Sequence, residues 1–566
     1  MKPISKICFI VFFIVCCCSA IFADSLETFQ LSHPVYDEVE ALYVMEGKSS
    51  PMGAKPWTHE DVRRLLENVI PSTNGARDLW THINNYLNSD DGFIFNAVLE
   101  PQLMLHTNKS FIGTKEIVCS ENLDRQFAVL GFGYNYKDNL SLYMDASIGV
   151  APSDVHTVDP STLKSNNEVS KRLSSIWGTN IPFLPDGFNI MNFPNNAYLA
   201  VGNRAFRAIS GRGQVEWGNG TLGNMILGNT LPYHDYFSLT FTGSDKFSYQ
   251  LLSSFFSHSI NKKENSTNDR KPLNGLRFFL GHRFEFTLLQ GKLLLALNDT
   301  MMYQSKDNYL DLRILNPMFF LHNGYMAGNS NSLASLEIEY SPIKNLSLYA
   351  QFALDDYAVF GEPKPGEAGA SADGLAAMLG VRAFIPVSSS SYSYGVAEFV
   401  YTSPFMYHRA MEHEDIYIRE LYFVSSTRYM TGSQSFLERY LSFPFGSDAL
   451  AGILKFGYKK LDVFDISTSI FLMDHGVIDE FSTITQYHGG EQITNTPSTT
   501  NPFAPTESKG GKVEYTVIPS INLSYYIKPW LPLNIGVDLI CIWNKENYSA
   551  PVVYDLQLNL GLSIKY

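Results

Sequence analysis

Apolar and polar residues alternate along much of the chain from about residue 92 onward. In the last segment, every second residue from Val552 to Tyr566 is apolar or aromatic, and the positions between include Asp555, Gln557 and Lys565. A period of two places the two sets on opposite faces of a β-strand. The same alternation recurs at residues 140–148, 276–286, 346–355 and 534–543. The pattern predicts a large sheet with one apolar face and one polar face.

Tyr554 and Tyr566 delimit the apolar face of the last segment. The residues between them span roughly 40 Å along a strand, and a tilt of about 40° reduces this to a height of about 30 Å. Two rings at this spacing fit the aromatic girdles of a membrane-spanning β-barrel, and a soluble β-sandwich would not bracket its strand in this way. A last strand that ends on an aromatic residue is also typical of outer-membrane barrels, so we expect the barrel assembly machinery to be a partner.

The connections between the expected strands have two lengths. Tight turns are expected at residues 137–139, 290–291, 342–345, 459–462 and 528–532, and long polar stretches at about 151–196, 258–275, 304–332, 356–374 and 474–512. Outer-membrane barrels have short periplasmic turns and long external loops. Counting back from the C-terminus gives about 18 strands, give or take two, for roughly 475 residues. We therefore predict an all-β membrane protein, a large antiparallel outer-membrane β-barrel of about 18 strands.

Residues 32–88 carry a helical pattern in place of the strand pattern. Thr58 with Asp61 three residues later resembles a capping box, and apolar residues follow at helical spacing. Two further helical stretches are expected at 34–47 and 79–87. Three short amphipathic helices bury little surface alone, so we expect them to dock on the barrel, as a small helical segment on its periplasmic side.

A leader precedes both parts. Lys2 and Lys6 stand before the apolar run 7–18, and a small residue precedes Asp24, which is the pattern of a secretory signal peptide. A lipoprotein acylated at one of residues 16–18 is the alternative. The expected division is a signal peptide at 1–23, a periplasmic helical segment at 24–89 and a transmembrane β-barrel at 90–566.

Composition excludes other classes of protein. Only 17% of the residues are charged and 14% are aromatic, whereas soluble proteins carry about 25% charged residues. After the leader, no stretch approaches the ~18 apolar residues of a membrane-spanning helix. A closed barrel is the remaining structure that satisfies its backbone groups in lipid, so we expect contact with outer-membrane lipid and a location in the outer membrane. The net charge of −14 gives no support for nucleic-acid binding, and we expect a monomer.

No set of catalytic or cofactor-binding residues stands out. The chain lacks a phosphate-binding glycine loop and a metal-spaced Cys/His set, and the stretch 369–374 places its second glycine one position too late for a nucleophile elbow. Glu412, His413, Glu414 and Asp415 could collect a hard cation, but such a run in an external loop is usually just solvated. We expect no enzymatic activity, no metal and no cofactor.

Polar and aromatic residues at lumen or loop positions are the candidates for a binding site. Sugars contact aromatic faces through their C–H surfaces, and charged or amide groups hydrogen-bond their hydroxyls. The candidate glycan-binding residues are Arg212, Glu216, Trp217, Asn316, Tyr349, Gln351, Asp355 and Asp356. The same residues also fit the salt-bridged packing that fills the interior of any wide barrel, and the sequence leaves both interpretations open.

The segments around these residues resemble the Wzi-type capsule-assembly outer-membrane proteins, and the resemblance covers most of the chain. It includes Lys55-Pro56-Trp57, RGQVEWGNGTLGNMILGNTLP from 212, GLRFFLGHRFEF from 275, ILNPMFF from 314, LSLYAQFALDDYAVFGEPKPGE from 346 and AEFVYTSPFMYH from 397. The stretch 349–356 and the pair at 316–317 are the more specific signals. The resemblance implies an eighteen-stranded barrel, closed on its periplasmic side by the helices, that acts as a lectin without catalysis.

The expected function is an outer-membrane barrel that binds and anchors capsular or other surface polysaccharide and assists capsule assembly. A porin or sugar-uptake channel is the main alternative, and an adhesin is a third. A porin needs an open lumen, whereas an anchor can be plugged. An acidic capsule would be repelled by this acidic chain unless basic loop residues dominate locally, namely Lys262, Lys263, Arg270 and Lys271.

Overall fold

The structure is a computed structural model, and it describes residues 25–566 with several gaps. The gaps are 88–91, 109–117, 119–125, 151–153, 159–164, 170–175, 184–188, 257–258, 263–269, 274–275, 306–329, 356–373, 409–421, 431–432, 479–504 and 507–511.

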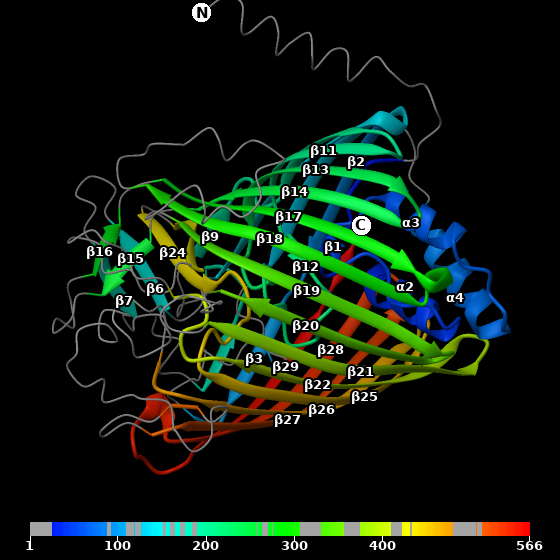
Figure 1. Cartoon of the computed structure of the whole chain (residues 1–566). Coiled ribbons are helices and arrows are strands. Elements are labelled where there is room, and N and C mark those ends of the chain that lie inside the picture. The colour runs from blue at the N-terminus through cyan, green and yellow to red at the C-terminus, as the bar shows by residue number, and fades with distance from the viewer. Residues whose placement is uncertain are drawn as a thin grey trace, which may run out of the picture.

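A single antiparallel sheet closes on itself to form a barrel (Figure 1). The strands of the ring, in order, are β2 (Gly92–Leu99) continued by β3 (Gln102–His106), β4 (Ala128–Tyr136), β5 (Leu140–Val150), β10 (Ala197–Gly202), β11 (Phe206–Gly213), β13 (His234–Ser244), β14 (Phe247–Phe255), β17 (Leu276–Leu288), β18 (Leu293–Ser305), β19 (Ser330–Ile343), β20 (Leu346–Leu354), β21 (Leu375–Ser388), β22 (Ser391–Thr402), β25 (Ala449–Lys460), β26 (Phe464–His475), β27 (Glu514–Lys528), β28 (Leu531–Trp543) and β29 (Val553–Leu562) continued by β30 (Ile564–Lys565). The ring closes where β29 pairs with β3 and β30 pairs with β2. Counting each interrupted strand once, the described residues form eighteen positions in the ring, which agrees with the predicted number.

Shorter strands lie beside the ring. β9 (Asn189–Asn192) continues the line of β10 along β5, and β8 (Trp177–Thr179) pairs with β3. Three hairpins are β6–β7 (Asp154–Val158 and Ser165–Val169), β15–β16 (Ser259–Lys262 and Arg270–Leu273) and β23–β24 (Phe423–Met430 and Ser433–Tyr440). Figure 1 shows these hairpins at one end of the barrel and the helices at the other. We call these the loop end and the helical end.

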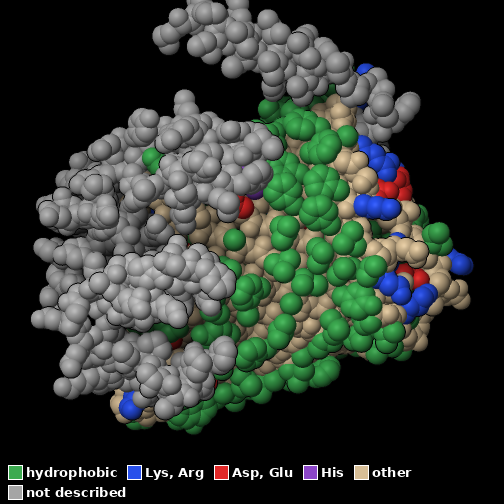
Figure 2. All heavy atoms as spheres, viewed as in Figure 1, with side chains coloured by type: hydrophobic (Ala, Val, Ile, Leu, Met, Phe, Trp, Pro, Cys, Tyr) green, Lys and Arg blue, Asp and Glu red, His purple; other side chains and the backbone are tan. Residues whose placement is uncertain are grey.

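The outward face of the ring is apolar. Along β29, Tyr554 and Leu556 are exposed while Asp555 and Gln557 are buried, as the alternation predicts. Figure 2 shows hydrophobic side chains over the strands and charged side chains at the helical end. Members of this apolar surface include Phe132, Leu199, Phe241, Leu297, Leu348, Leu379, Phe399, Phe456, Ile470 and Ile521. A closed sheet with an apolar exterior is the arrangement that a lipid bilayer requires.

Short turns join the ring strands at the helical end. They lie at residues 137–139, 203–205, 245–246, 289–292, 344–345, 389–390, 461–463 and 529–530. The five predicted turn regions all fall at this end, and the predicted long stretches connect the ring strands at their opposite ends. Long connections that were not predicted also lie between ring strands, at residues 107–127, 214–233 and 403–448.

Helices cover the helical end of the barrel (Figure 1). They are α2 (Val35–Met45), α3 (His59–Glu67) and α4 (Asn74–Asn85). The predicted capping box is present, because the Asp61 N–H donates to Thr58 Oγ1 at 3.2 Å and the Thr58 N–H donates to Asp61 Oδ2 at 2.9 Å. Apolar residues of the helices pack with Phe384, Tyr392 and Leu461 of the barrel. No helix in the described ranges is both long enough and apolar enough to cross a membrane.

Buried ion pairs hold the helices on the barrel. Lys459 of β25 donates to Glu38 of α2 at 2.8 Å, and Arg207 of β11 pairs with Asp61 at the start of α3. Although burial alone would raise the pKa of Asp61, Arg207 and Arg64 hold it below its ordinary value. The carboxylate therefore stays ionised at neutral pH and continues to hold α3 against the wall.

Two histidines lie in the same segment, His59 buried and His33 partly buried. The ring of His59 stacks on Phe29 with 4.5 Å between centroids, and His33 meets Tyr86 edge-on at 4.8 Å. Burial lowers the pKa of His33 to about 3 and that of His59 to about 4, with smaller contributions from neighbouring cations. Both rings are therefore neutral while the helices are docked. In an undocked segment, exposed histidines take up protons below about pH 6.5.

Acid should weaken the docking of the helices. Below about pH 6.5 the undocked segment binds more protons than the docked one, so docking loses free energy as the pH falls, by about 2 kcal/mol per histidine at pH 5. Hydrogen exchange of the α3 amides, corrected for the intrinsic effect of pH, should show less protection at pH 5 than at pH 7.5. Replacing His33 and His59 together by Gln should flatten this dependence. Equal protection at both pH values in the natural chain would contradict the expectation.

Candidate functional site

The connection between β11 and β13 enters the barrel and fills it. This lumen loop, residues 214–233, includes β12 (Glu216–Trp217). Its buried apolar side chains, each at most 3% exposed, are Val215, Trp217, Leu222, Met225, Ile226, Leu227 and Leu231. They share one apolar cluster with Phe279 of β17, Val400 of β22 and Ile540 of β28, which lie at separate positions of the ring. Protein atoms therefore occupy the lumen across its width.

Two glycines allow the lumen loop to turn inside this confined space. Gly218 has a φ of +110° and Gly223 a φ of +125°, in the region that favours glycine. A Cβ on Gly218 would collide with the side chain of Asn224, and a Cβ on Gly223 would collide with Pro444. Backbone conformation and available space both exclude a side chain at these positions, which accounts for their glycines.

The N-terminal segment meets the lumen loop inside the barrel. β1 (Ala54–Lys55) pairs antiparallel with β12, so that Ala54 lies opposite Trp217 and Lys55 opposite Glu216. The Lys55 Nζ donates to Glu216 Oε2 at 2.9 Å, and both side chains are largely buried. A segment that enters from the helical end is thus joined by strand pairing to a loop that enters from the loop end.

Side chains on the opposite wall bind the backbone of the lumen loop. Glu398 of β22 accepts the N–H groups of Thr221 and Leu222 at 2.6 and 2.8 Å. Gln351 of β20 accepts the Met225 N–H at 3.0 Å. These bonds satisfy backbone groups that the loop carries into the lumen. The loop therefore bridges from β11 and β13 to β20 and β22.

Trp217 is enclosed by ring residues. Its side chain is 1% exposed, and its Nε1–H donates to Gln250 Oε1 of β14 at 2.6 Å. Phe279 contacts the indole edge-on with 6.1 Å between centroids, and Gly281 leaves room for the ring. A sugar could stack on this indole only if the lumen loop left the barrel.

A buried ion cluster lies next to the indole. The side chain of Arg283 is fully buried, with Nε donating to Glu285 at 2.7 Å and two further N–H groups donating to Glu337 at 2.6 and 3.0 Å. Glu285 also accepts the N–H of Gly53 at 2.9 Å. The Arg283 guanidinium carbon lies 5.9 Å from the centre of the Trp217 ring. The cluster thus ties β17, β19, the N-terminal segment and the lumen loop together.

Tyr349 belongs to a second polar cluster. Its hydroxyl donates to Glu398 Oε2 at 2.6 Å, and the guanidinium of Arg382 lies 3.9 Å above its ring. Arg382 of β21 also donates to the carbonyl of Asn219 in the lumen loop and pairs with Glu40 of α2. One arginine therefore contacts both the docked helices and the lumen loop.

The structure brings four of the predicted site residues together. Glu216 and Trp217 lie on the lumen loop, and Tyr349 and Gln351 contact it from the wall. All four are buried and hydrogen-bonded to other parts of the chain. In this arrangement they hold the loop to the wall, which is the packing interpretation. Their contact with glycan stays a prediction.

Arg212 and Asp355 lie away from this group. Arg212, at the end of β11, forms a two-point ion pair with Asp235, at 2.6 Å from Nε and 2.8 Å from Nη2, and its guanidinium lies 4.0 Å above the ring of Tyr233. Asp355 follows β20 and accepts from Asn331 Nδ2 at 3.2 Å. Both side chains are partly exposed. Solvent can therefore reach Arg212, whereas the Oδ1 atom of Asp355 is buried.

Several predictions fall outside the described residues. They concern Asn316, Asp356, the leader at 1–23, the acidic run at 412–415 and the side chains of the basic residues at 262–271. Within the described ranges, no group of three or more His, Cys, Asp or Glu side chains is placed to hold a metal ion.

Several residues that hold the lumen loop were not among the predicted site residues, namely Gln250, Glu339, Arg382 and Glu398. Each of them occupies a polar-face position on a ring strand. A charged or amide residue at an inward position is the signal that could have found them. The alternation does not show which inward residues meet, because that depends on where each strand stands in the ring.

Comparisons with known proteins concern the fold. No protein-family model matches the chain, and no curated protein matches it. Among solved structures, Wzi of Escherichia coli, described as an outer-membrane protein involved in group 1 capsule assembly and as a carbohydrate-binding β-barrel, matches with a TM-score of 0.56 and 14% identity, over 95% of this chain and 99% of Wzi. OprD of Pseudomonas aeruginosa (TM-score 0.40, 8% identity, 85% and 97% covered) and OccAB4 of Acinetobacter baumannii (0.39, 10%, 85% and 99%) also match.

The likeness to Wzi shows a shared architecture over nearly the whole chain. It agrees with two independent observations, the eighteen-position ring and the apolar exterior. The chain is thus an outer-membrane β-barrel whose lumen is filled by its own N-terminal segment and lumen loop.

Proposed function

We propose that this barrel binds surface polysaccharide at its loop end, holds it at the cell and so assists capsule assembly. The filled lumen is the observation that carries the proposal. A lumen loop bonded to opposite walls makes the barrel a rigid support for a binding surface, and it leaves no wide route for a solute. The fold likeness to Wzi, which is described as a carbohydrate-binding barrel involved in capsule assembly, supports a glycan as the ligand.

In this proposal the two ends of the barrel face different compartments. Short turns of outer-membrane barrels face the periplasm and long loops face the outside. The helical end then faces the periplasm, where α2, α3 and α4 cover the barrel mouth. The loop end faces the outside and meets the polysaccharide.

The pair of Arg212 and Asp235 is the described place where we expect glycan contact. Their side chains are 23% and 47% exposed, so both charges can be reached from solvent. Charged groups arranged in pairs hydrogen-bond neighbouring sugar hydroxyls. Asp355, with Asp356 beside it in the sequence, is the second such place.

Two measurements on the intact purified protein test the proposal. In planar bilayers we expect no large steady conductance, because the lumen is filled. In a titration with the surface polysaccharide isolated from the bacterium that makes the protein, we expect saturable binding. A large steady conductance without polysaccharide binding would favour a porin and contradict the proposal.

A matched pair of variants tests where the polysaccharide binds. Arg212→Ala should weaken binding about tenfold, because a lost hydrogen bond to a charged group costs about 1.5 to 3 kcal/mol. Arg204→Ala is the control, because Arg204 lies in a turn at the helical end and pairs with Glu67. An equal effect of the two substitutions, or no effect of either, would place the contact elsewhere.

A further inference from the structure

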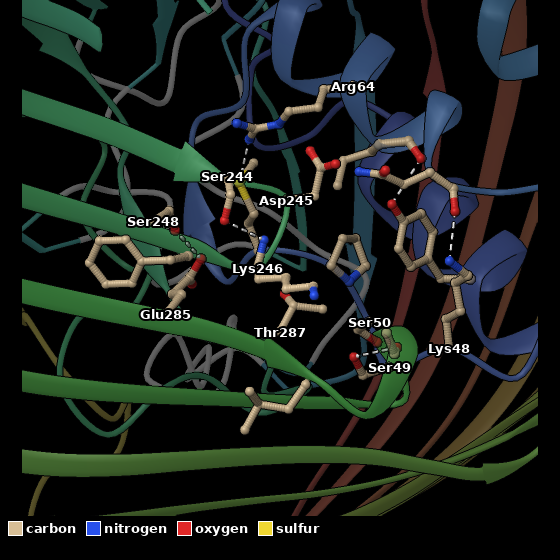
Figure 3. Close-up of a pocket in the computed structure, with 18 of the residues that line it drawn as sticks. Lys48, Ser49, Ser50, Arg64, Ser244, Asp245, Lys246, Ser248, Glu285 and Thr287 are labelled. Atoms are coloured by element: carbon tan, nitrogen blue, oxygen red, sulfur yellow. Dashed lines mark hydrogen bonds between the residues drawn. The ribbon is translucent and has the colours of Figure 1, made fainter. Parts of the chain in front are cut away.

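A cavity of about 350 Å³ lies at the helical end, between α3 and the turns that join β13 to β14 and β17 to β18. Figure 3 shows Arg64 on the helix side of this cavity and Lys246 and Thr287 on the strand side. Lys48 and neighbouring residues after α2 complete the wall. The volume is at the lower end of the roughly 300 to 1,000 Å³ of small-molecule sites. It suits a ligand of about one sugar unit.

Two lysines at this cavity form no ion pair with any carboxylate that the structure describes. The Lys48 Nζ donates to the carbonyl of Asn68 at 2.6 Å, which uses one of its three N–H groups. Burial lowers the pKa of Lys48, as is expected for an ammonium without a counter-charge. Lys246 lies in an exposed turn, where its backbone N–H donates to Ser244 Oγ at 3.2 Å. Two positive charges are thus available to an anion.

The acidic residues of the lining already face cations. Glu285 accepts from Arg283 Nε at 2.7 Å. The charge of Asp245 acts on Arg204, whose pKa is raised mainly by Glu67 and to a smaller extent by Asp245. Neither carboxylate is therefore needed to balance the two lysines, so the cavity keeps an excess of positive charge in a chain of net charge −14.

The remaining lining suits a ligand rich in hydroxyl groups. Ser244, Thr287 and Gln290 supply side-chain donors and acceptors, while Tyr43 supplies aromatic surface. A few polar groups among apolar and aromatic walls are typical of small-molecule sites, and aromatic faces pack against the C–H surface of a sugar.

We propose that this cavity binds an acidic sugar, meaning a sugar unit that carries a carboxylate or a phosphate. Its anionic group lies between Lys48 and Lys246, and its hydroxyls bond to Ser244, Thr287 and Gln290. This site is separate from the glycan surface at the loop end, and the inference does not rest on the function proposed above. The ligand arrives either as a free sugar acid or as one unit of a polysaccharide.

Calorimetric titration of the intact protein tests the proposal. The probes are D-galacturonate, D-galactose 1-phosphate, neutral D-galactose and a galacturonate tetramer. Both acidic monosaccharides should bind about tenfold or more tightly than galactose, because hydrogen bonds to charged groups are the stronger ones. Tighter binding of the tetramer would assign the site to a polysaccharide, and preference for the monomer would assign it to a free sugar acid. Equal affinity for galactose and galacturonate would overturn the proposal.

Variants of one exposed lysine make the test specific. Lys246→Gln should weaken galacturonate binding about tenfold and leave galactose unchanged, whereas Lys246→Arg should retain most of the affinity. Lys344→Gln is the matched control, because Lys344 lies at the same end, pairs with Glu46 at 3.0 Å and does not line the cavity. Lys48→Gln removes the second cation and should also weaken galacturonate binding. If neither lysine substitution changes galacturonate binding in a folded barrel, the cavity is not the site.

Discussion

A barrel in which a two-residue Asn-Gly turn replaces residues 214–233 should be an open pore. Gly213 and His234 are paired neighbours on β11 and β13, so a tight hairpin turn can join them directly. The deletion removes the apolar residues that bridge the lumen. We expect single-channel conductance to rise about tenfold or more over the intact protein, because a ring of this many strands encloses an interior wide enough for water.

The matched control keeps the loop and changes one side chain. Trp217→Phe retains most of the ring volume, so this barrel should stay closed even though the hydrogen bond to Gln250 is lost. Both variants must migrate as folded barrels on unheated gels. A folded barrel without the lumen loop that conducts no better than the intact protein would show that the N-terminal segment seals the lumen by itself.

Arg283→Gln should destabilise the barrel by about 3 to 5 kcal/mol, the usual cost of removing one partner of a buried ion pair. The guanidinium is fully buried and balances Glu285 and Glu337. Without it, two carboxylates remain inside the protein with no cation between them. Urea unfolding of the barrel in lipid vesicles, followed by gel mobility, measures the loss.

Two further variants show whether charge is the cause. The triple substitution Arg283→Gln, Glu285→Gln and Glu337→Gln removes the whole cluster and should recover a large part of the stability. Arg204→Gln breaks a pair with Glu67 in which both side chains are 50% exposed, and should cost less than about 1 kcal/mol. A loss at Arg283 no larger than the loss at Arg204 would contradict a buried cluster.

The wall of the barrel could be predicted from the sequence because lipid imposes a simple rule on it. Outward positions in contact with lipid are apolar, so β29 alternates without interruption and Tyr554 and Leu556 are exposed as expected. The short turns and the capping box at Thr58 are also local features, in which a few neighbouring residues decide the conformation. Local signals therefore sufficed for the ring strands, the short turns and the helices, but not for the hairpins β6–β7 and β15–β16, which lie in stretches predicted as polar loops.

The lumen loop could not be predicted in the same way. Its apolar residues, such as Trp217 and Ile226, read like part of a strand, but they pack inside the barrel against several strands at once. Because the loop is contacted from all sides, its apolar residues do not recur with the period of a strand or of a helix. Gly218 and Gly223, which have positive φ values, are the local sign of this fold in the sequence. Only the structure shows that a side chain at either position would collide with Asn224 or Pro444.

The candidate site was predicted as a set of residues and not as an arrangement. Tyr349 and Gln351 were named because they are polar or aromatic at inward positions, and they do meet the lumen loop. Arg382 and Glu398, which complete the same contacts, come from other strands. The closure of the ring decides which inward residues meet. The alternation in a single sequence does not show which strands face each other across the lumen.

The ion pair between Glu38 and Lys459 has a consequence for biogenesis, because its partners are 421 residues apart in the chain. The helical segment leaves the ribosome early, yet Phe384, Tyr392 and Leu461, on which it docks, are made much later. During that interval the apolar faces of α2, α3 and α4 have no native partner, and exposed apolar surface leads to aggregation. The helices therefore reach their docked state only after the strands that carry Phe384, Tyr392 and Lys459 have joined the barrel.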